Sequence, residues 1–210
     1  MTFMGYKRPD GLVGIRNHVL ILPTCACASE TCRVVSQQVA GSIHIMNNSG
    51  CAEVKANEDM TQTILRGFAA NPNIFGTVVI GLGCENVGHR ELREAIEKIT
   101  NKPIVSFGIQ EEGGTPNTIR LAVRAAREMV AAASIQKREP CGMSNLILGL
   151  ECGGSDATSG FAANPALGYV SDKLIAMGAS TVMAETIELI GAEHVLARRG
   201  ATREIHDQII

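Results

Sequence analysis

Short apolar runs that alternate with stretches of helical periodicity are the feature of this sequence that most constrains its fold. These runs, each followed by a helical pattern, lie at 18–22, 43–46, 77–80 and 103–107. Strands that alternate with helices favour parallel β-sheets, because a crossover between parallel strands needs a helix-length connection. We therefore predict an α/β fold that begins with a parallel-sheet, Rossmann-like three-layer domain.

A polar segment at 137–140 interrupts this alternation and is typical of a linker. Another apolar run follows at 146–150, and a helix is expected near 185–198. We predict two domains. Residues 1–138 would form the three-layer domain, and residues 142–210 would form the beginning of a second α/β domain.

Composition narrows the class of protein. The chain has 210 residues, of which 45% are hydrophobic and 19% charged, so it can build a core and is not expected to be disordered. A net charge of −2 gives no reason to expect binding to nucleic acid or to an anionic membrane. No apolar run reaches the roughly 18–20 residues of a membrane span, and residues 1–8 lack the apolar core of a secretory signal. Seven cysteines in such a chain favour reduced thiols and a cytoplasmic location.

The chemically unusual residues fall where the predicted strands end. Four predicted strands are followed by Cys27, Cys51, Cys84 and Cys152, and the remaining one by the loop 110–114. Ligands of open parallel sheets bind outside the carboxyl ends of the strands, so we expect these loops to form a shared thiol-rich site. The alternative for each cysteine is an ordinary buried thiol. One of Cys25 and Cys27 is expected to face the core, and no pair has the usual spacing of zinc ligands.

The stretch 150–160, with the sequence LECGGSDATSG, concentrates polar and small residues directly after a strand. Adjacent glycines, Gly153 and Gly154, allow backbone amides to turn toward an anion. Glu151, Cys152 and Asp156 are of metal-ligand or acid–base types. The alternative interpretation is a glycine-rich turn whose polar groups only cap the next helix.

Three common motifs are excluded by the sequence. Gly81-Leu82-Gly83 lacks the third glycine of a dinucleotide fingerprint, because Asn86 stands in its place. There is also no P-loop and no Gly-x-Ser-x-Gly elbow. A cysteine nucleophile with a histidine base stays open, and His89, near the start of a predicted helix, is the candidate histidine.

Several motifs spread along the chain are specific in combination. They are GYKRPDGLVGIRN at 5–17, GLGCE at 81–85, GLECGGSD at 149–156, ANPA at 163–166, AET at 184–186 and GAE at 191–193. Together they resemble the altronate/galactarate dehydratase family over the whole length of the chain. That family also includes the large subunits of (2R)-sulfolactate sulfo-lyases.

The resemblance implies a reaction, a cofactor and partners. Family members are iron-dependent lyases that eliminate water or sulfite from a 2-hydroxy or 2,3-dihydroxy acid, such as altronate, galactarate or sulfolactate, and give a 2-keto acid. The cofactor would be Fe²⁺ or an iron–sulfur cluster. A small beta-clip (SAF-like) domain, separate in split members, would be a partner subunit, and we expect a homo-oligomer. Family chains continue beyond residue 210, so we expect this chain to be an inactive fragment.

The resemblance also implies which residues act. β-Elimination needs a base for the α-proton, a Lewis acid for the leaving group and stabilisation of the enolate. The candidate metal ligands are Cys27, Cys51, Cys84 and Cys152. The candidate catalytic residues are Asp156 and Glu185 first, then Glu85 and His89. The candidate substrate-binding residues are Arg16, Asn17, Gln110, Gly153, Gly154, Ser155 and Asn164. For each carboxylate, a helix cap or a structural hydrogen bond is the alternative role.

One position departs from the family pattern. Sugar-acid members have His-x-x-Gly-Cys at the second strand end, whereas this chain has Asn47 before Gly50-Cys51. The missing histidine favours a sulfolactate-type or other substrate over galactarate or altronate. Two other functions stay open: a non-catalytic large subunit or scaffold that needs a small partner, and an iron–sulfur or zinc enzyme of other chemistry.

Overall fold

The computed structural model describes residues 1–154 and 156–210 and divides the chain into two compact units. The first unit covers Thr2–Cys141 and the second covers Gly142–Ile210. The division falls at the end of the segment that we predicted as a linker. That segment is itself ordered, because β7 (Glu139–Gly142) is a strand of a small sheet.

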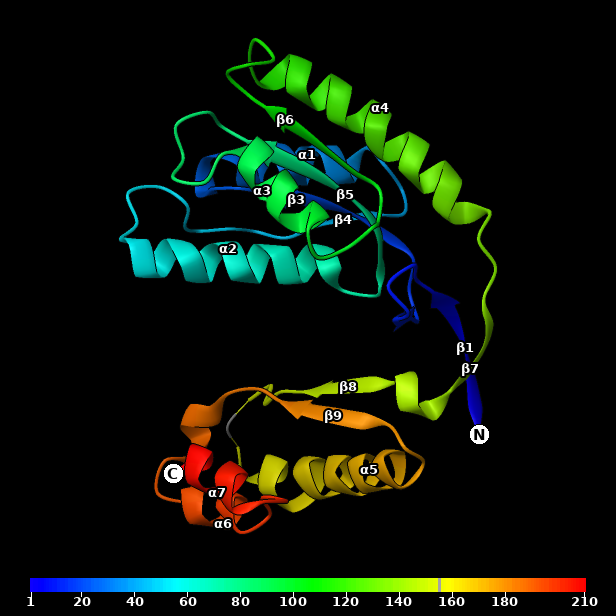
Figure 1. The fold of residues 1–210 in the computed structure, drawn as a ribbon, viewed down its shortest axis with the longest axis vertical. Helices are drawn as coiled ribbons and strands as arrows, with labels where there is room; N and C mark the ends of the chain where they lie inside the picture. The colour runs from blue at the N-terminus through cyan, green and yellow to red at the C-terminus, as the bar shows by residue number, and fades with distance from the viewer. Residues whose placement is uncertain (155) are drawn as a thin grey trace. The chain divides into compact units, whose positions relative to one another are not determined.

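A parallel sheet of four strands forms the centre of the first unit (Figure 1). Its order is β4 (Ser42–His44), β3 (His18–Pro23), β5 (Ile74–Gly81) and β6 (Ile104–Gly108). The central strands β3 and β5 are almost wholly buried, which explains why they read as continuous apolar runs. The chain adds β4 on one side of β3 and β5 on the other, so the topological switch point lies between β3 and β5.

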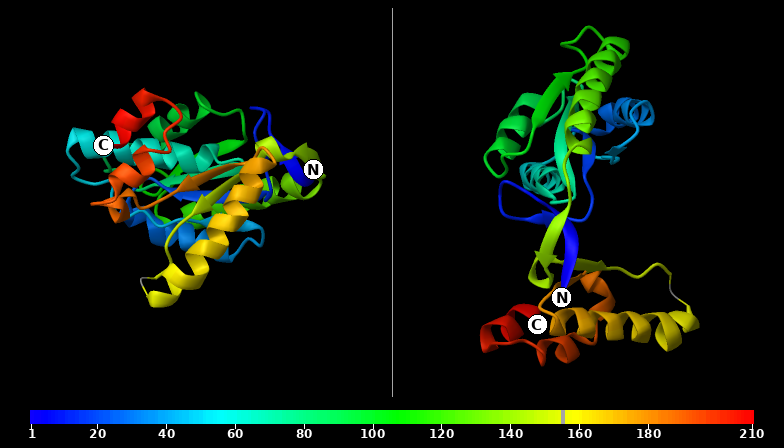
Figure 2. Two further views of the ribbon diagram at one scale, coloured as in Figure 1. Left: turned by 90° about the horizontal axis from the view of Figure 1, so that it is seen from below. Right: turned by 90° about the vertical axis from the view of Figure 1, so that its right-hand side faces the viewer.

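Two pairs of helices cover the two faces of this sheet, and the right-hand view of Figure 2 shows the sheet between them. The helices are α1 (Ala26–Gln37), α2 (Lys55–Ala70), α3 (His89–Glu97) and α4 (Thr115–Ser134). Val19 and Ile21 pack with α1 and α4, whereas Leu20 and Leu22 pack with α2 and α3. Alternate residues of β3 therefore enter opposite cores, and the predicted three-layer arrangement is confirmed.

Buried polar groups help to hold the amino end of the sheet together. The second sheet of this unit joins β2 (Val13–Gly14), β1 (Thr2–Lys7) and β7. Arg8 directly follows β1 and is buried. It donates to Pro72 O at 2.7 Å, to Arg16 O at 2.9 Å and to Asn17 Oδ1 at 2.7 Å. The buried Lys102 Nζ donates to three carbonyls at the end of α2, those of Ala69, Ala70 and Asn71, at 2.6–3.0 Å.

The second unit has a much smaller sheet. Strands β8 (Ile147–Leu150) and β9 (Ser180–Met183) form a parallel pair. Helices α5 (Asn164–Ala176), α6 (Glu193–Ala197) and α7 (Arg203–Ile209) complete it. The single helix predicted near 185–198 is wrong, because a 3-10 turn at Thr186–Leu189 and Gly191, with φ of +86°, separate that stretch from α6. Among the described residues of the whole chain, no helix is both long and apolar enough to cross a membrane.

Candidate functional site

Three of the predicted ligand cysteines lie at the carboxyl edge of the four-stranded sheet. Cys27 is in the first turn of α1, which follows β3, and its side chain is exposed. Cys51 and Cys84 are exposed in the loops that follow β4 and β5. Cys25 is the buried member of the Cys25-Ala26-Cys27 pair, as one of the two was expected to be. The parallel topology thus brings three thiols from separate loops to one edge.

The thiols influence one another electrostatically. Partial desolvation and the neighbouring Cys25, Cys27 and Cys84 raise the pKa of the Cys51 thiol to about 11, and a hydrogen bond with Cys25 adds to the shift. Each thiolate formed here opposes the next, so ionisation of the group is unfavourable without a compensating cation. Sequence reasoning missed Cys25 as a member of this group, because its position in the core set it aside.

The donor set suits a soft transition-metal ion or an iron–sulfur cluster, both of which are held by thiolates. A bound cation would relieve the mutual repulsion that disfavours the Cys51 thiolate. Across residues 1–154 and 156–210, no group of three or more His, Cys, Asp or Glu side chains is already spaced to hold an ion. The fit therefore rests on the chemistry of the clustered thiols.

Glu85 lies at the switch point between β3 and β5. Its Oε1 accepts a hydrogen bond from Thr24 Oγ1 at 2.9 Å, and its Oε2 accepts one from the Gly83 amide at 2.5 Å. Burial opposes ionisation of Glu85, but the Gly83, Glu85 and Cys84 amides and the Thr24 hydroxyl outweigh it and lower the pKa of this carboxyl. A carboxylate held in this way is a weak base, so the geometry favours the structural alternative for Glu85.

His89 has both ring nitrogens engaged. Nδ1 lies 3.1 Å from Ser106 Oγ, and Nε2 lies 3.0 Å from Glu111 Oε2. The hydrogen bond with His89 and the nearby Arg90, which also pairs with Glu111, lower the pKa of the Glu111 carboxyl. A carboxylate on Nε2 fixes the tautomer with the proton on Nε2, which leaves Nδ1 to accept from the Ser106 hydroxyl.

A cavity of about 360 Å³ lies beside His89, and it brings three predicted residues together, namely Glu85, His89 and Gln110. Its other lining residues are Gly83, Gly88, Arg90, Gly108 and Glu111. A Cβ atom at Gly108 would lie 2.7 Å from His89 Nε2, so only glycine leaves room for the imidazole there. The sequence analysis did not predict a role for Arg90, Ser106 or Glu111. Glu111 belongs to the predicted strand-end loop, whereas Ser106 lies inside a strand and gave no signal.

Arg16 and Asn17 lie at the other end of the sheet, directly before β3. The side-chain amide of Asn17 donates to Ala133 O at 2.8 Å, and its oxygen accepts from Arg8. The Arg16 side chain is exposed. Within the first unit these two residues are therefore not brought to the thiol edge, and the Asn17 side chain is used in holding the fold together.

The second unit has its own cavity, of about 490 Å³, and this cavity includes two of the predicted residues, Cys152 and Asn164. The remaining lining residues include Glu151, Asp172, Glu188 and Arg199. The geometry can accept a small polar molecule, because carboxylates, a thiol, an amide and one guanidinium surround it.

The remaining predicted residues of the second unit have local roles. Asp156 Oδ1 accepts from the Thr158 hydroxyl and amide and from the Ser159 amide, and these bonds lower the pKa of its carboxyl. Asp156 thus caps the turn that leads into α5, which is the alternative role considered for it. Glu185 is exposed, with φ of +61°.

The two glycines of the loop after β8, Gly153 and Gly154, are exposed, and the Gly154 carbonyl accepts from Ser159 Oγ at 2.8 Å. The loop therefore uses its carbonyl in a hydrogen bond of its own. Ser155 lies outside the described residues, so its predicted contact with substrate stays a prediction.

The sequence matches two family models. Residues 5–134 match the model of the second domain of D-galactarate dehydratase/altronate hydrolase, and residues 143–210 match the C-terminal domain of D-galactarate/altronate dehydratase. The two matched ranges correspond to the two structural units.

Three relatives support the same assignment. The (2R)-sulfolactate sulfo-lyase subunit beta of Chromohalobacter salexigens is 39% identical over 99% of this chain and 52% of its own length. The altronate dehydratase of Bacillus subtilis is 35% identical over 100% of this chain and 44% of its own length. The altronate dehydratase of Escherichia coli is 34% identical over 91% of this chain and 40% of its own length. The chain spans about half the length of the curated relatives it matches.

Proposed function

Because this chain belongs to the D-galactarate dehydratase/altronate hydrolase family, we propose that it forms part of a lyase for small hydroxy acids. The lyase would eliminate water or sulfite and release a 2-keto acid. The observation that carries the proposal is the convergence of thiols from three strand ends on one edge of the first unit.

The proposed cofactor is Fe²⁺ or an iron–sulfur cluster, held in the first unit by Cys27, Cys51 and Cys84. Cys152 stays a ligand predicted from the sequence alone. When bound, the cofactor would supply Lewis-acid polarisation of the substrate carboxylate and of the leaving group. Thiolates are the ligands that iron–sulfur clusters use, which is why the donor set supports this assignment.

His89 is the residue that we propose for the α-proton. Glu111 holds the proton on Nε2, so Nδ1 keeps a lone pair directed at the Ser106 hydroxyl. A proton from the substrate would reach Nδ1 through that hydroxyl, which donates its own proton to Nδ1 as it accepts the new one. The Glu111 carboxylate would then stabilise the imidazolium.

Gln110 and Arg90 line the cavity beside His89 and would bind the substrate. Ser106 lines a second cavity, which shares His89, Arg90 and Glu111 with the first. Arg90 pairs with Glu111 and is otherwise exposed, so its remaining N–H groups can meet a carboxylate. Gln110 offers an amide to a hydroxyl or carbonyl oxygen. Asp156, Glu185 and the loop Gly153–Gly154 of the second unit stay candidates for contacts with substrate.

The proposed substrate is of the sulfolactate type. Asn47 replaces the histidine that sugar-acid members have, and the Chromohalobacter salexigens relative at 39% identity is named for a sulfo-lyase. That relative is named as subunit beta, which supports a requirement for a partner subunit, and we propose that the partner is the small one expected from the sequence. We also propose a homo-oligomer and a cytoplasmic location, the latter because all seven cysteines are free thiols.

The test is anaerobic purification of this protein, with analysis of iron and sulfide. A small partner subunit would be added, and the release of sulfite and pyruvate from sulfolactate would be compared with the release of keto acid from altronate and galactarate. Cys84→Ser is expected to abolish bound iron, whereas Cys141→Ser, at a buried thiol in β7, is expected to leave it unchanged. A protein that binds zinc alone, or one whose iron is unaffected by Cys84→Ser, would refute the proposal.

A further inference from the structure

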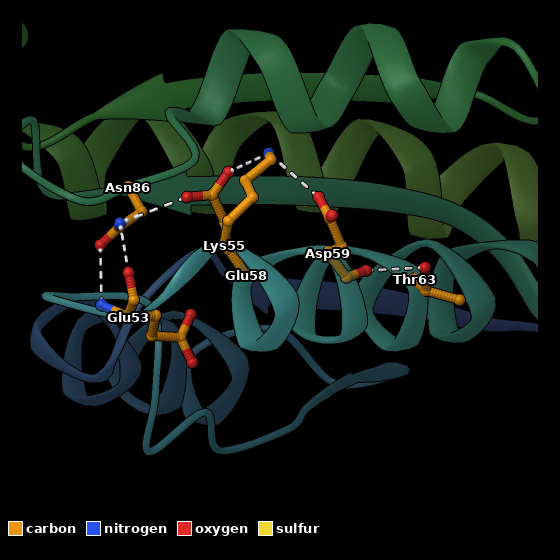
Figure 3. A network of polar contacts seen from close by, with 6 residues as sticks. All are labelled: Glu53, Lys55, Glu58, Asp59, Thr63 and Asn86. Atoms are coloured by element: carbon orange, nitrogen blue, oxygen red, sulfur yellow. Dashed lines mark hydrogen bonds and ion pairs between the residues drawn. The ribbon is translucent and has the colours of Figure 1, made fainter.

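Asn86 joins the two loops that carry Cys51 and Cys84. The Asn86 amide donates to Gly50 O at 3.0 Å, one residue before Cys51. The Asn86 side chain then pairs with the Glu53 backbone, accepting from its N–H at 3.4 Å and donating to its carbonyl at 3.3 Å. Figure 3 shows the Asn86 side chain directed at Glu53 and at the beginning of α2. A residue two positions after Cys84 thus holds the backbone on both sides of Cys51.

The beginning of α2 anchors Asn86 in turn. Asn86 Nδ2 lies 3.3 Å from Glu58 Oε2. Glu58 also accepts from Lys55 Nζ at 2.7 Å, and Lys55 reaches Asp59 at 3.0 Å (Figure 3). The hydrogen bonds from Lys55 and then Asn86 lower the pKa of the Glu58 carboxyl, so Glu58 is a charged acceptor at neutral pH. The contact is therefore a hydrogen bond to a charge, which is stronger than a neutral one.

The opposite side of the Cys51 loop is held by the end of β3. Asn47 Nδ2 donates to Thr24 O at 3.0 Å, and the Ala26 amide donates to Ser49 O at 2.9 Å. Gly50 has φ of +101°, and a Cβ atom there would lie 2.8 Å from Cys25 Cα. The two hydrogen bonds and the close approach of Gly50 hold the loop against Cys25 and Ala26. On the side that faces Cys84, every hydrogen bond between the two loops among the described residues involves Asn86.

We propose that Asn86 is a positioning residue that sets the spacing between Cys51 and Cys84 and so gives the thiol group its capacity for a soft metal ion. The inference rests on the proposed thiol site but not on the lyase reaction. Asparagine is suited to this position because one side chain supplies an acceptor for an N–H and donors for a carbonyl and a carboxylate. Aspartate keeps the acceptor, loses both donors and places a second charge beside Glu58.

The test is a titration of the reduced, metal-free protein with Co²⁺, in which thiolate-to-cobalt absorption reports ligation by cysteine. Asn86→Ala is expected to weaken Co²⁺ binding by about 10- to 100-fold, the usual effect of removing a group that orients metal ligands. Asn73→Ala is the matched control. Asn73 Oδ1 accepts from the Ile15 and Arg16 amides at 2.8 and 3.0 Å, but before β5 rather than after it.

The outcomes separate the two proposals. If Asn86→Ala binds Co²⁺ as tightly as the unaltered protein, the role of Asn86 is wrong and the thiol site stands. If the unaltered protein gives no thiolate-to-cobalt absorption, both the thiol site and the role of Asn86 are wrong. Should Asn86→Ala fail to fold, Asn86→Asp replaces it, because it retains the acceptor for Glu53 and is expected to lose at least tenfold in Co²⁺ affinity. Unchanged affinity in Asn86→Asp would then overturn the role of the side-chain donors.

Discussion

The two units place their polar residues by different means. In the first unit, strand residues such as Ile21 and Ile80 are 0% exposed, and the loops that carry the thiols begin where those strands end. In the second unit, Ile147 of β8 is 61% exposed and Val182 of β9 is 58% exposed. The buried apolar residues described there are few, namely Met143, Ala179 and Ala197.

The difference shows how a buried core fixes the positions of the loop residues beside it. A parallel sheet is stable when helices cover both faces, and a pair of strands by itself is marginal. The site of the first unit is therefore positioned by a core, and small changes in its loops leave the strand ends in place. The loop after β8 depends on local hydrogen bonds such as those of Asp156, so its geometry is set by a few side chains.

The largest effect is expected from matched isoleucines in the two units. Ile80→Ala should lower the free energy of unfolding by about 2–5 kcal/mol, because it leaves a cavity in a closed core. Ile147→Ala, at an exposed strand position, should change it by about 0.5 kcal/mol or less. Urea unfolding of both variants measures the contrast. Equal losses would contradict the view that the second unit lacks a comparable core.

The next effect tests the polar end of the first unit. Lys102→Met should lower the free energy of unfolding by about 2 kcal/mol, because three carbonyls at the end of α2 lose their donor. Lys98→Met, at an exposed lysine, is the control and should change little.

The burial of Lys102 also makes the stability of the protein depend on pH. It lowers the pKa of Lys102 from 10.5 to about 8, so between these values the unfolded chain binds more protons than the folded one. The stability of the unaltered protein should therefore rise from pH 8 to pH 10.5 relative to that of Lys102→Met. A difference that stays constant with pH would show that the lysine keeps its proton when folded.

A smaller effect is expected at the switch point. Glu85→Gln should lower the free energy of unfolding by about 1.5 kcal/mol at pH 7, since the hydrogen bonds of Thr24 and Gly83 no longer meet a charge. The lowered pKa means that this contribution is complete above the ordinary value of 4.5 and disappears as the pH falls through the lower, folded-state value. Thermal unfolding at a series of pH values measures this contribution. Glu97→Gln, which removes a surface pair with Arg93, serves as the control.

The smallest effect concerns the proposed base. Glu111→Gln should lower kcat/KM roughly tenfold, or about 1.4 kcal/mol, because the carboxylate no longer fixes the tautomer of His89. Glu112→Gln is the control. Glu112 is the next residue in the chain, it has no hydrogen bond to His89 among the described residues, and its variant should retain full activity. Nitrogen NMR of the imidazole gives a second readout. A single Nε2–H tautomer in both variants would rule out a positioning role for Glu111.

The sequence predicted the layers and the edge of the site because both follow from short-range patterns. The run at 77–80 lies within β5. The rule that functional residues follow the carboxyl ends of parallel strands predicted the positions of Cys27, Cys51 and Cys84. The pairing of β1 with β7 was missed, since these strands are far apart in the chain and β7 has the composition of a linker. The hydrogen bond of His89 with Ser106 was missed for a related reason, because a serine inside a strand carries no local signal.

The segment after β5 carries a constraint on length as well as on composition. Three consecutive residues, Cys84, Glu85 and Asn86, face the thiol group, the end of β3 and the Cys51 loop respectively. An inserted or deleted residue between Gly81 and Asn86 would break at least one of these attachments whatever its side chain. Variation among functional sequences should therefore consist of substitutions here, while insertions collect elsewhere in the chain.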